Sequence, residues 1–267
     1  MLTGPRIRNA RRAAFFVALL AVWHGVHLWG PWPSFLVPGP VQVAEALWNG
    51  LADGTFLIGI IVSMKRLLIG YSISLGLGTL IGVLLGRVPW VDETAGSLML
   101  GLQTLPSICW LPLAIIWFGL NEKAIQFVVI MGAILAIAIH TSDGVKNIPP
   151  IYVRAGRNLG ARGWRLLVGV ILPAALPSVL TGAKLGWSFA WRSLMAAELI
   201  FMSLGLGQLL QVGRELNDIA QVMAVMLVII ALGLIVDNLV FGRLERRMRR
   251  VWGLAAALPG RPRPRRV

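Results

Sequence analysis

Residues 142–177 read SDGVKNIPPIYVRAGRNLGARGWRLLVGVILPAALP, a polar and basic stretch inside an otherwise apolar chain. The stretch is too long to be a simple connection between two helices. Pro149 can begin a helix, because the first turn of a helix needs no backbone donors, and Gly160 suits the left-handed conformation that ends one. A second short helix would follow, and Pro173 would end it. We therefore expect two short helices joined by a glycine turn, and we call residues 149–172 the helical loop.

The first helix of this loop has two chemically different sides. Ile151, Ala155 and Leu159 recur at helical spacing on one side, whereas Arg154 and Arg157 lie off it. A rigid element of this kind, standing outside the membrane, is suited to transmitting force from a soluble partner.

The composition of the whole chain indicates a membrane protein. Of its 267 residues, 57% are hydrophobic and only 13% are charged, and the mean hydropathy is +0.77. A water-soluble domain of this size needs a larger charged surface, and a membrane-spanning helix needs about 20 mostly apolar residues. We therefore expect an all-α membrane protein with six transmembrane helices, at residues 13–29, 67–85, 98–118, 125–139, 179–201 and 219–241.

Small residues are regularly spaced in the second of these segments. Gly70, Ser74, Gly78, Gly82 and Gly86 all fall four residues apart, and small residues let helices approach closely in lipid. We favour packing inside the chain over a dimer seam as the use of this face.

The basic residues indicate orientation rather than nucleic-acid binding. The net charge is +14, but the charges gather at the chain ends and in the helical loop and form no stripe with interleaved aromatic residues. Because lysine and arginine are enriched in cytoplasmic loops, we expect both termini in the cytoplasm. No small-residue cleavage site follows the first apolar run, so we expect a retained anchor.

Enzyme and metal motifs are absent from the sequence. No glycine is followed by lysine, so there is no phosphate-binding loop of the GxxxxGK type. The single cysteine, Cys109, excludes a disulfide within the chain, and His24 and His27 lack further ligands nearby. We expect no catalytic residue, no metal site and no cofactor bound by the chain itself.

The helical loop resembles the EAA signature of the permeases of binding-protein-dependent ABC importers. The resemblance rests on the run Arg154-Ala155-Gly156, on Gly160, and on Val170-Ile171-Leu172-Pro173. Arg154 stands where the family usually has glutamate, and Gly156 where it has alanine. The resemblance implies helices that seat in a cleft on an ATPase. It gives these candidate coupling residues: Arg154, Ala155, Gly156, Leu159, Gly160, Ala161, Trp164, Leu172 and Pro173.

Further landmarks resemble the nitrate, sulfonate and taurine branch of this family. They are Leu36-Val37-Pro38-Gly39-Pro40, residues 63–70, residues 111–119, Ala196-Ala197-Glu198-Leu199 and Gly205-Leu206-Gly207. The resemblance implies an ABC type-1 (MetI-like) permease fold over residues 36–252. It would be preceded by a basic terminus and first transmembrane helix (1–35) and followed by a basic, disordered tail (253–267).

The same resemblance implies the partners and the setting. The chain would lie in the bacterial plasma membrane beside a second copy of itself, with two ATPase subunits that bind ATP and Mg²⁺. A periplasmic or lipid-anchored binding protein would deliver the solute, a small anion such as a sulfonate, taurine, nitrate or bicarbonate. Membrane lipids are the other expected partner, and nucleic acid is not one.

Four residues are candidates for the translocation path. Arg192 lies in the fifth apolar segment, where a charge is costly and usually functional; it either helps an anion to pass or forms a structural pair with Glu198. The family implies a gate or packing role for Glu198. Ser107 and Cys109 lie between two prolines of the third segment, which mark either the solute path or a kink used for packing.

Two other classes of protein compete with this interpretation. A secondary transporter driven by an ion gradient would have inverted repeats with paired broken helices, and the sequence has no such repeat. A structural membrane protein would have no use for the helical loop.

Overall fold

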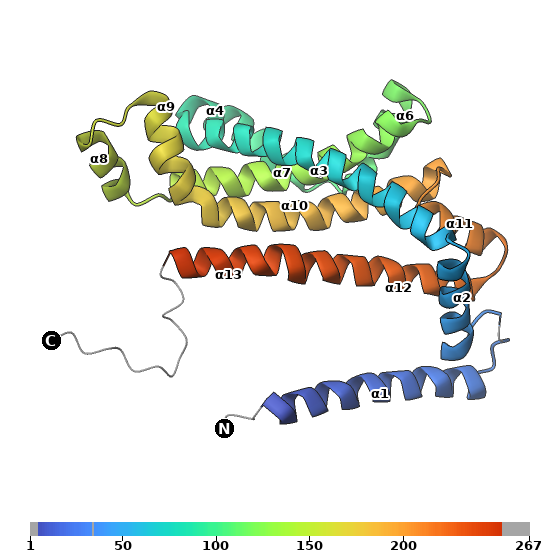
Figure 1. The fold of residues 1–267 in the computed structure, drawn as a ribbon. Coiled ribbons are helices and arrows are strands. Elements are labelled where there is room, and N and C mark those ends of the chain that lie inside the picture. The colour runs from blue at the N-terminus through green and yellow to red at the C-terminus, as the bar shows by residue number, and fades with distance from the viewer. Residues whose placement is uncertain (1–4, 34, 253–267) are drawn as a thin grey trace. The chain divides into compact units, whose positions relative to one another are not determined.

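The structure is a computed structural model that describes residues 5–33 and 35–252, and every regular element in these ranges is a helix. The predicted tail, residues 253–267, lies outside the described residues. Figure 1 shows the helices, and the contacts between residues divide the chain into two compact units. The first contains the chain up to Lys65 together with Glu198–Ile230, and the second contains Arg66–Ala197 and the chain from Ala231 onward.

The first unit begins with α1 (Pro5–Trp29) and α2 (Pro40–Ala52). The Trp23 indole donates to the Pro38 carbonyl at 3.1 Å, and His27 Nδ1 lies 2.7 Å from the Val37 carbonyl oxygen. These contacts fasten the end of α1 to the loop before α2. The apolar side chains along the rest of α1 are exposed, as expected of a helix that faces lipid.

Three helices, α3 (Thr55–Arg87), α10 (Leu172–Phe201) and α12 (Ile219–Val236), are divided between the two units, and α11 (Leu206–Glu215) belongs wholly to the first. The first unit takes the start of α3, the end of α10 and the start of α12. Asp53 accepts a hydrogen bond from the Thr55 amide at 2.8 Å, and this bond lowers the pKa of the Asp53 carboxyl group.

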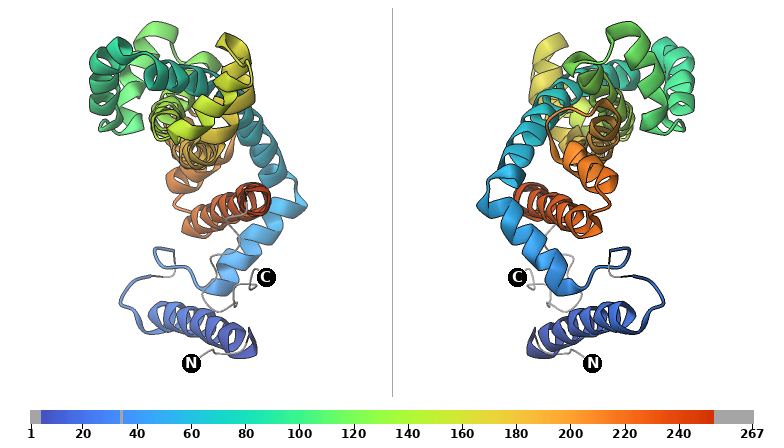
Figure 2. Two further views of the ribbon diagram at one scale, coloured as in Figure 1. Left: turned by 90° about the vertical axis from the view of Figure 1, so that its left-hand side faces the viewer. Right: turned by 90° about the vertical axis from the view of Figure 1, so that its right-hand side faces the viewer.

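The second unit holds the other parts of α3, α10 and α12 and all the remaining elements. In chain order they are α4 (Pro89–Val91), η1 (Asp92–Gly96), α5 (Ser97–Gln103), η2 (Ser107–Trp110), α6 (Leu111–Phe118), α7 (Glu122–Lys146), α8 (Pro150–Asn158), α9 (Gly163–Leu166), η3 (Leu167–Ile171), η4 (Asp237–Phe241) and α13 (Gly242–Val251). The two side views show α7 and α10 nearly end-on, one beside the other (Figure 2).

Glycine brings α3 against α7, which confirms the predicted packing inside the chain. A Cβ atom at Gly82 would lie 2.4 Å from the Ala138 carbonyl oxygen, and one at Gly86 would lie 2.6 Å from Val145. Gly182 of α10 approaches His140 of α7 in the same way. Backbones this close gain dispersion contacts that lipid cannot offer.

Within residues 5–33 and 35–252, five helices are long and apolar enough to cross a membrane, and the expected third span differs from the rest. The prediction of one helix over residues 98–118 is wrong. Pro89–Gln103 and Ser107–Phe118 meet at an angle of 105°, and they make a sixth span only if counted together. The helix ends there because Pro106 lacks an amide hydrogen and the residue before a proline avoids helical geometry.

The expected end of the second loop helix at Pro173 is also wrong. From Gly163 to Phe201 the chain runs as one continuous helix of 39 residues, in which η3 is a π-helical turn. A π turn shifts the hydrogen-bond ladder, so a proline just after it fits without ending the helix. The helical loop is therefore joined to the fifth span without a flexible connection.

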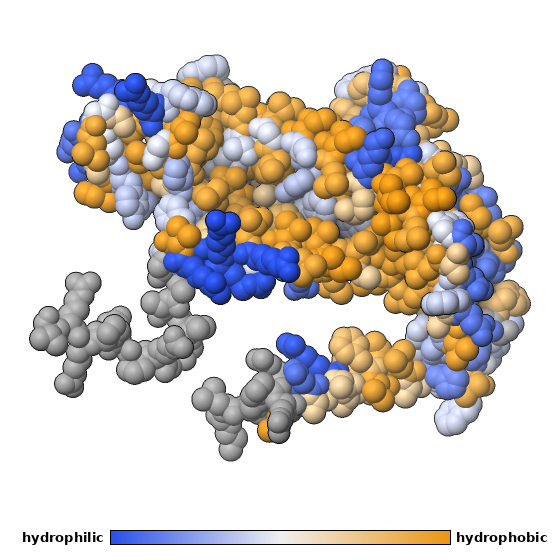
Figure 3. All heavy atoms as spheres, viewed as in Figure 1, coloured by the Kyte–Doolittle hydropathy of each residue, from blue (hydrophilic) through white to orange (hydrophobic). Residues whose placement is uncertain are grey.

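Much of the surface over these spans is apolar, as Figure 3 shows in orange. The exposed side chains include Ile69, Leu80, Ile230 and Leu234. A surface of this kind is stable in lipid and not in water.

Candidate coupling loop and transport cavity

The predicted glycine turn of the helical loop is confirmed. Gly160 follows the end of α8 with φ +86°, in the left-handed region. Its amide donates to the Arg157 carbonyl at 3.0 Å, and the Ala161 amide donates to the Gly156 carbonyl at 2.9 Å. This pair of bonds is a Schellman cap, which needs a residue that tolerates positive φ.

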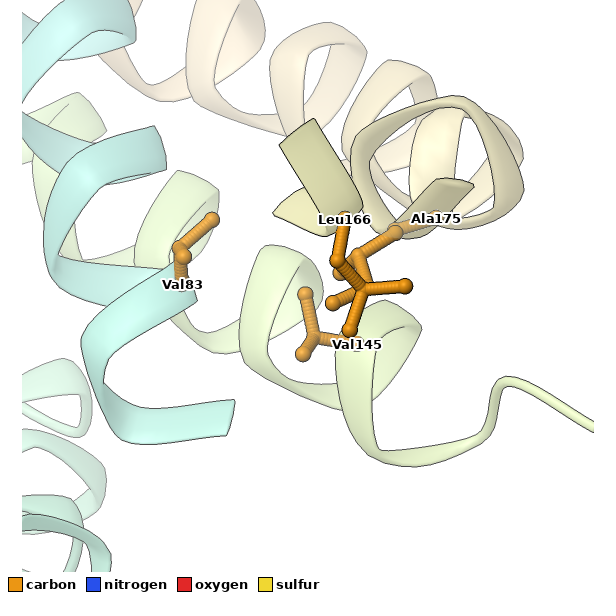
Figure 4. Close-up of a cluster of buried hydrophobic side chains, with 5 residues drawn as sticks. Val83, Val145, Leu166 and Ala175 are labelled. Atoms are coloured by element: carbon orange, nitrogen blue, oxygen red, sulfur yellow. The ribbon is translucent and has the colours of Figure 1, made fainter. Parts of the chain in front are cut away.

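The helical loop rests on a buried apolar cluster. Val145 of α7, Leu166 of α9, Ile171 of η3 and Ala175 of α10 pack together, with Val83 of α3 in the same cluster (Figure 4). Val153 and Ala161 cover this cluster from the loop side. Gly156 is buried here as well, since a Cβ at that position would lie 2.8 Å from Val170.

The opposite side of the helical loop is exposed although it carries large apolar residues. The exposed fractions are 65% for Ile151, 88% for Leu159 and 73% for Trp164. Ala155 lies on the same exposed side, as the helical spacing indicated. We refer to Ile151, Ala155, Leu159 and Trp164 as the docking face.

The nine candidate coupling residues thus divide into two groups. Arg154, Ala155, Leu159, Gly160, Trp164 and Pro173 are exposed. Gly156, Ala161 and Leu172 are buried or half-buried and contribute to the packing at the base of the loop. Ile151, which was not among the nine, belongs to the exposed group.

A cavity of about 280 Å³ lies where the broken third span meets α7 and α10. The break contributes Gln103, Thr104 and Ser107, and α10 contributes Phe189 and Arg192. The cavity therefore combines apolar walls with hydroxyl and amide groups and one fixed positive charge.

Arg192 is held at the edge of this cavity by its own helix. Its Nε donates to the Ser188 carbonyl at 3.2 Å, and its guanidinium carbon lies 4.9 Å from the centre of the Phe189 ring. The side chain remains exposed, so its other N–H groups can reach a solute. The structure thus brings Arg192 and Ser107 together, whereas Cys109 is exposed and lies outside the lining.

Glu198 occupies a different site and is completely buried. The Ser63 hydroxyl lies 2.9 and 2.7 Å from its two carboxylate oxygens, and the Gly207 amide donates to Oε2 at 3.0 Å. The Leu206 amide in turn donates to the Ser63 oxygen at 2.9 Å. We call Ser63, Glu198, Leu206 and Gly207 the carboxylate cluster.

The carboxylate cluster depends on glycine at the start of α11. A Cβ atom at Gly207 would lie 2.4 Å from the Glu198 Cβ atom, and one at Gly205 would lie 2.6 Å from its carboxyl group. The hydrogen bonds satisfy a group that would otherwise be costly to bury. These hydrogen bonds join Glu198 of α10 to the turn before α11.

Sequence reasoning missed several members of these sites. Gln103 and Thr104 have no motif, and only the Pro106 break could have indicated them. Ser63 is separated from Glu198 by 135 residues. Arg66, also missed, is buried on α3 and pairs with Glu122 at the start of α7.

Comparison of the sequence with known proteins identifies its family. Residues 76–250 match the family model of the binding-protein-dependent transport system inner membrane component. The Escherichia coli K12 protein SsuC, named as an aliphatic sulfonates transport permease, is 32% identical to this chain. The match covers 83% of this chain and 84% of SsuC. The taurine transport system permease TauC of the same organism is 30% identical, over 86% of this chain and 85% of its own.

A solved structure matches the fold. An inward-facing MetNI methionine ABC transporter aligns with a TM-score of 0.54 and 19% identity, and the alignment covers 78% of this chain and 96% of that one. At this identity the likeness concerns the fold alone, and it agrees with the expected MetI-like arrangement.

The described residues form an all-helical protein with several apolar spans, and the family match makes it a membrane transport subunit. More particularly, the chain belongs to the family of binding-protein-dependent transport system inner membrane components, the permeases of ABC importers. The expected nitrate, sulfonate and taurine branch is confirmed. It is a multi-pass inner-membrane protein and a permease subunit of an ABC transporter.

Proposed function

We propose that the docking face seats on an ATPase subunit and that the helical loop carries the movement of that ATPase into the membrane. The supporting observation is that large apolar side chains are exposed on an element whose other side is firmly packed. An exposed apolar patch with a polar rim is typical of a protein interface, and Arg154 and Arg157 supply the rim. ATP and Mg²⁺ are bound by the ATPase, of which two copies serve a pair of permeases.

The continuous helix from Gly163 to Phe201 is the mechanical link in this proposal. Trp164 of the docking face lies in its first turn, and Arg192 of the cavity lies farther along it. A displacement of the loop therefore moves the cavity wall as one body within the second unit. Closure of two ATPases on ATP would in this way expose the cavity to alternate sides of the membrane.

The remaining partners follow from the same arrangement. The exposed apolar surface of α1 suits lipid and a second copy of the chain, and the binding protein delivers solute at the periplasmic side. Both termini would be cytoplasmic, since the helical loop and α13 are strongly basic. A C-terminal reporter that is active only in the periplasm should give no signal, and a strong signal would contradict this topology.

The solute that the cavity suits best is a small anion. Fixed positive charge in a narrow apolar path lowers the barrier for an anion, provided that the binding is not too deep. Arg192 supplies this charge, and Gln103, Thr104 and Ser107 supply neutral hydrogen-bonding groups. Relatives named for sulfonates and for taurine support a sulfonate-like solute.

Uptake into vesicles tests the anion proposal. The permease would be reconstituted with its ATPase and binding protein, and ATP-dependent uptake of taurine and an alkanesulfonate would be measured. We expect Arg192→Gln to lower uptake about tenfold, because a hydrogen bond to a charged group contributes about 1.5–3 kcal/mol. The amount of ATPase that is pulled down with the permease, which we call ATPase recovery, should be unchanged. Arg214→Gln, which removes an exposed arginine of α11, is the control. Normal uptake by Arg192→Gln would make Arg192 structural.

A further inference from the structure

The last described helix, α13, carries a dense positive charge outside any site described above. Its ten residues contain five exposed arginines and one acidic residue, Glu245. Within residues 5–33 and 35–252 none of the five arginines forms an ion pair. The arginines are Arg243, Arg246, Arg247, Arg249 and Arg250.

The acidic residues that could have neutralised these arginines are already engaged by α10. Lys184 Nζ lies 3.2 Å from an Asp237 carboxylate oxygen and 3.3 Å from one of Glu245. This bridge fastens the start of α13 to α10 and leaves the arginine charge uncompensated. Figure 3 shows the hydrophilic side chains of α13 next to the hydrophobic surface of the turns before it.

The bridge also borders a hollow between the two helices. A cavity of about 390 Å³ is lined by Pro177, Leu180 and Thr181 of α10 and by Glu245, Met248 and Arg249 of α13. One wall is apolar, and Arg249 stands at the cavity with its guanidinium exposed. Such a lining suits a molecule with a negative head and an apolar body.

The length of the helix that ends in α13 indicates that this cavity lies at the level of the lipid headgroups. The helix from Ile219 to Val251 has 33 residues, about 50 Å at 1.5 Å per residue. The hydrocarbon core of a bilayer is only about 30 Å thick. The turns after Asp237 therefore extend beyond the core, at the level where phosphates lie.

We propose that the cavity between α10 and α13 holds an anionic glycerophospholipid, with its phosphate on Arg249 and its glycerol and upper acyl chains against Leu180 and Met248. A basic pocket between membrane helices is the usual form of such a site. The apolar wall favours a lipid over a free anion, because inorganic phosphate has nothing to place against it. The site is independent of the proposed solute and of ATPase docking.

Lipid selectivity in nanodiscs tests the proposal. The full chain would be placed in phosphatidylcholine nanodiscs, and the association of spin-labelled phosphatidylglycerol would be compared with that of spin-labelled phosphatidylcholine. We expect wild type to prefer phosphatidylglycerol and Arg249→Gln to lower that preference about fivefold, the contribution of one basic residue near an anionic surface. Thr181→Trp, which fills the cavity and keeps every charge, should lower it as well.

Arg243→Gln is the matched control, because Arg243 lies on α13 and does not line the cavity. It should keep most of the preference, and excess inorganic phosphate should not displace the labelled lipid. Equal losses in the two arginine variants, with no effect of Thr181→Trp, would show diffuse attraction and overturn the site. A pull-down of the ATPase by the same variants would be measured alongside. If Arg249→Gln keeps the preference for phosphatidylglycerol but recovers less ATPase, α13 contacts the ATPase instead and the lipid site is overturned.

Discussion

The docking face and the carboxylate cluster place side chains in opposite and equally unusual ways. The docking face leaves Leu159 and Trp164 exposed although both are apolar, whereas the carboxylate cluster buries Glu198 completely although it is an acid. Leu159 and Trp164 are exposed because the other side of the helical loop packs on the buried apolar cluster. Glu198 can be buried because Ser63 and Gly207 donate hydrogen bonds to its carboxylate.

The difference shows which part of the chain is complete by itself. The polar atoms of Glu198 have their partners inside the chain, so this cluster can serve stability alone. The docking face has its packing on one side only, and in the proposed function its exposed side gains free energy by contact with the ATPase. A substitution in the first should change stability, and a substitution in the second should change assembly.

The largest effect on stability is expected at Gly207. Gly207→Ala would press a methyl group against the Glu198 Cβ atom at 2.4 Å and against backbone at 2.9 Å. We expect a loss of about 3 kcal/mol, since overpacking a tight interior usually costs about 1–3 kcal/mol and neighbouring backbone cannot yield here. Thermal unfolding in detergent measures this loss.

Gly25→Ala provides the control for that measurement. A Cβ atom at Gly25 of α1 would meet nothing within 4 Å, so this variant should unfold at or above the wild-type temperature. Equal stability of the two variants would contradict the close approach of Glu198 and α11.

The next effect is expected at the turn of the helical loop. Gly160→Val places a β-branched residue at φ +86°, which costs about 1–2 kcal/mol or more in the left-handed region. The turn should change its path, so that ATPase recovery and uptake both fall about tenfold while the protein still inserts. Pull-down of the ATPase and uptake in cells would be measured together.

Gly169→Val is the matched control for the turn. Gly169 lies in η3 of the same loop, has open space around it and does not have positive φ. Retained uptake in this variant and in Gly160→Val alike would refute the assignment of the loop as the coupling element.

The smallest change in stability, and a clear change in assembly, is expected at Leu159. Its side chain is exposed, so Leu159→Asp should keep stability within about 0.5 kcal/mol. ATPase affinity should fall about tenfold, as for a central apolar residue of an interface. Leu216→Asp, at a similarly exposed leucine after α11, should leave affinity unchanged.

The sequence alone was sufficient for features that depend on local chemistry. Hydropathy located the spans because each needs a long apolar run, and Gly160 was identified because a helix end of this type requires positive φ. The glycine face of α3 was identified because four-residue spacing places Gly82 and Gly86 on one side. The helical loop was expected from its own residues, and the resemblance to the permease family added the ATPase and the nine candidate coupling residues.

The sequence analysis did not predict features that depend on the backbone hydrogen-bond pattern within a helix or on contacts between residues far apart in the sequence. The prolines of the third segment indicated a possible kink, but hydropathy averaged over a window did not separate two helices at Pro106. Pro173 was taken as a stop because a π turn has no known residue pattern. Residues 63–70 were named as a family landmark, but nothing in the sequence connected Ser63 with Glu198, which lies 135 residues away.

Cross-linking at Leu159 tests the central claim most directly. Cys109 is the only cysteine of the chain, so Cys109→Ser with Leu159→Cys gives a single thiol on the docking face. With a short thiol-to-amine reagent, we expect a covalent adduct between this permease and its ATPase. The same change at Leu216 should give none. An adduct at Leu216 and none at Leu159, in a complex that still imports its solute, would contradict docking through the helical loop.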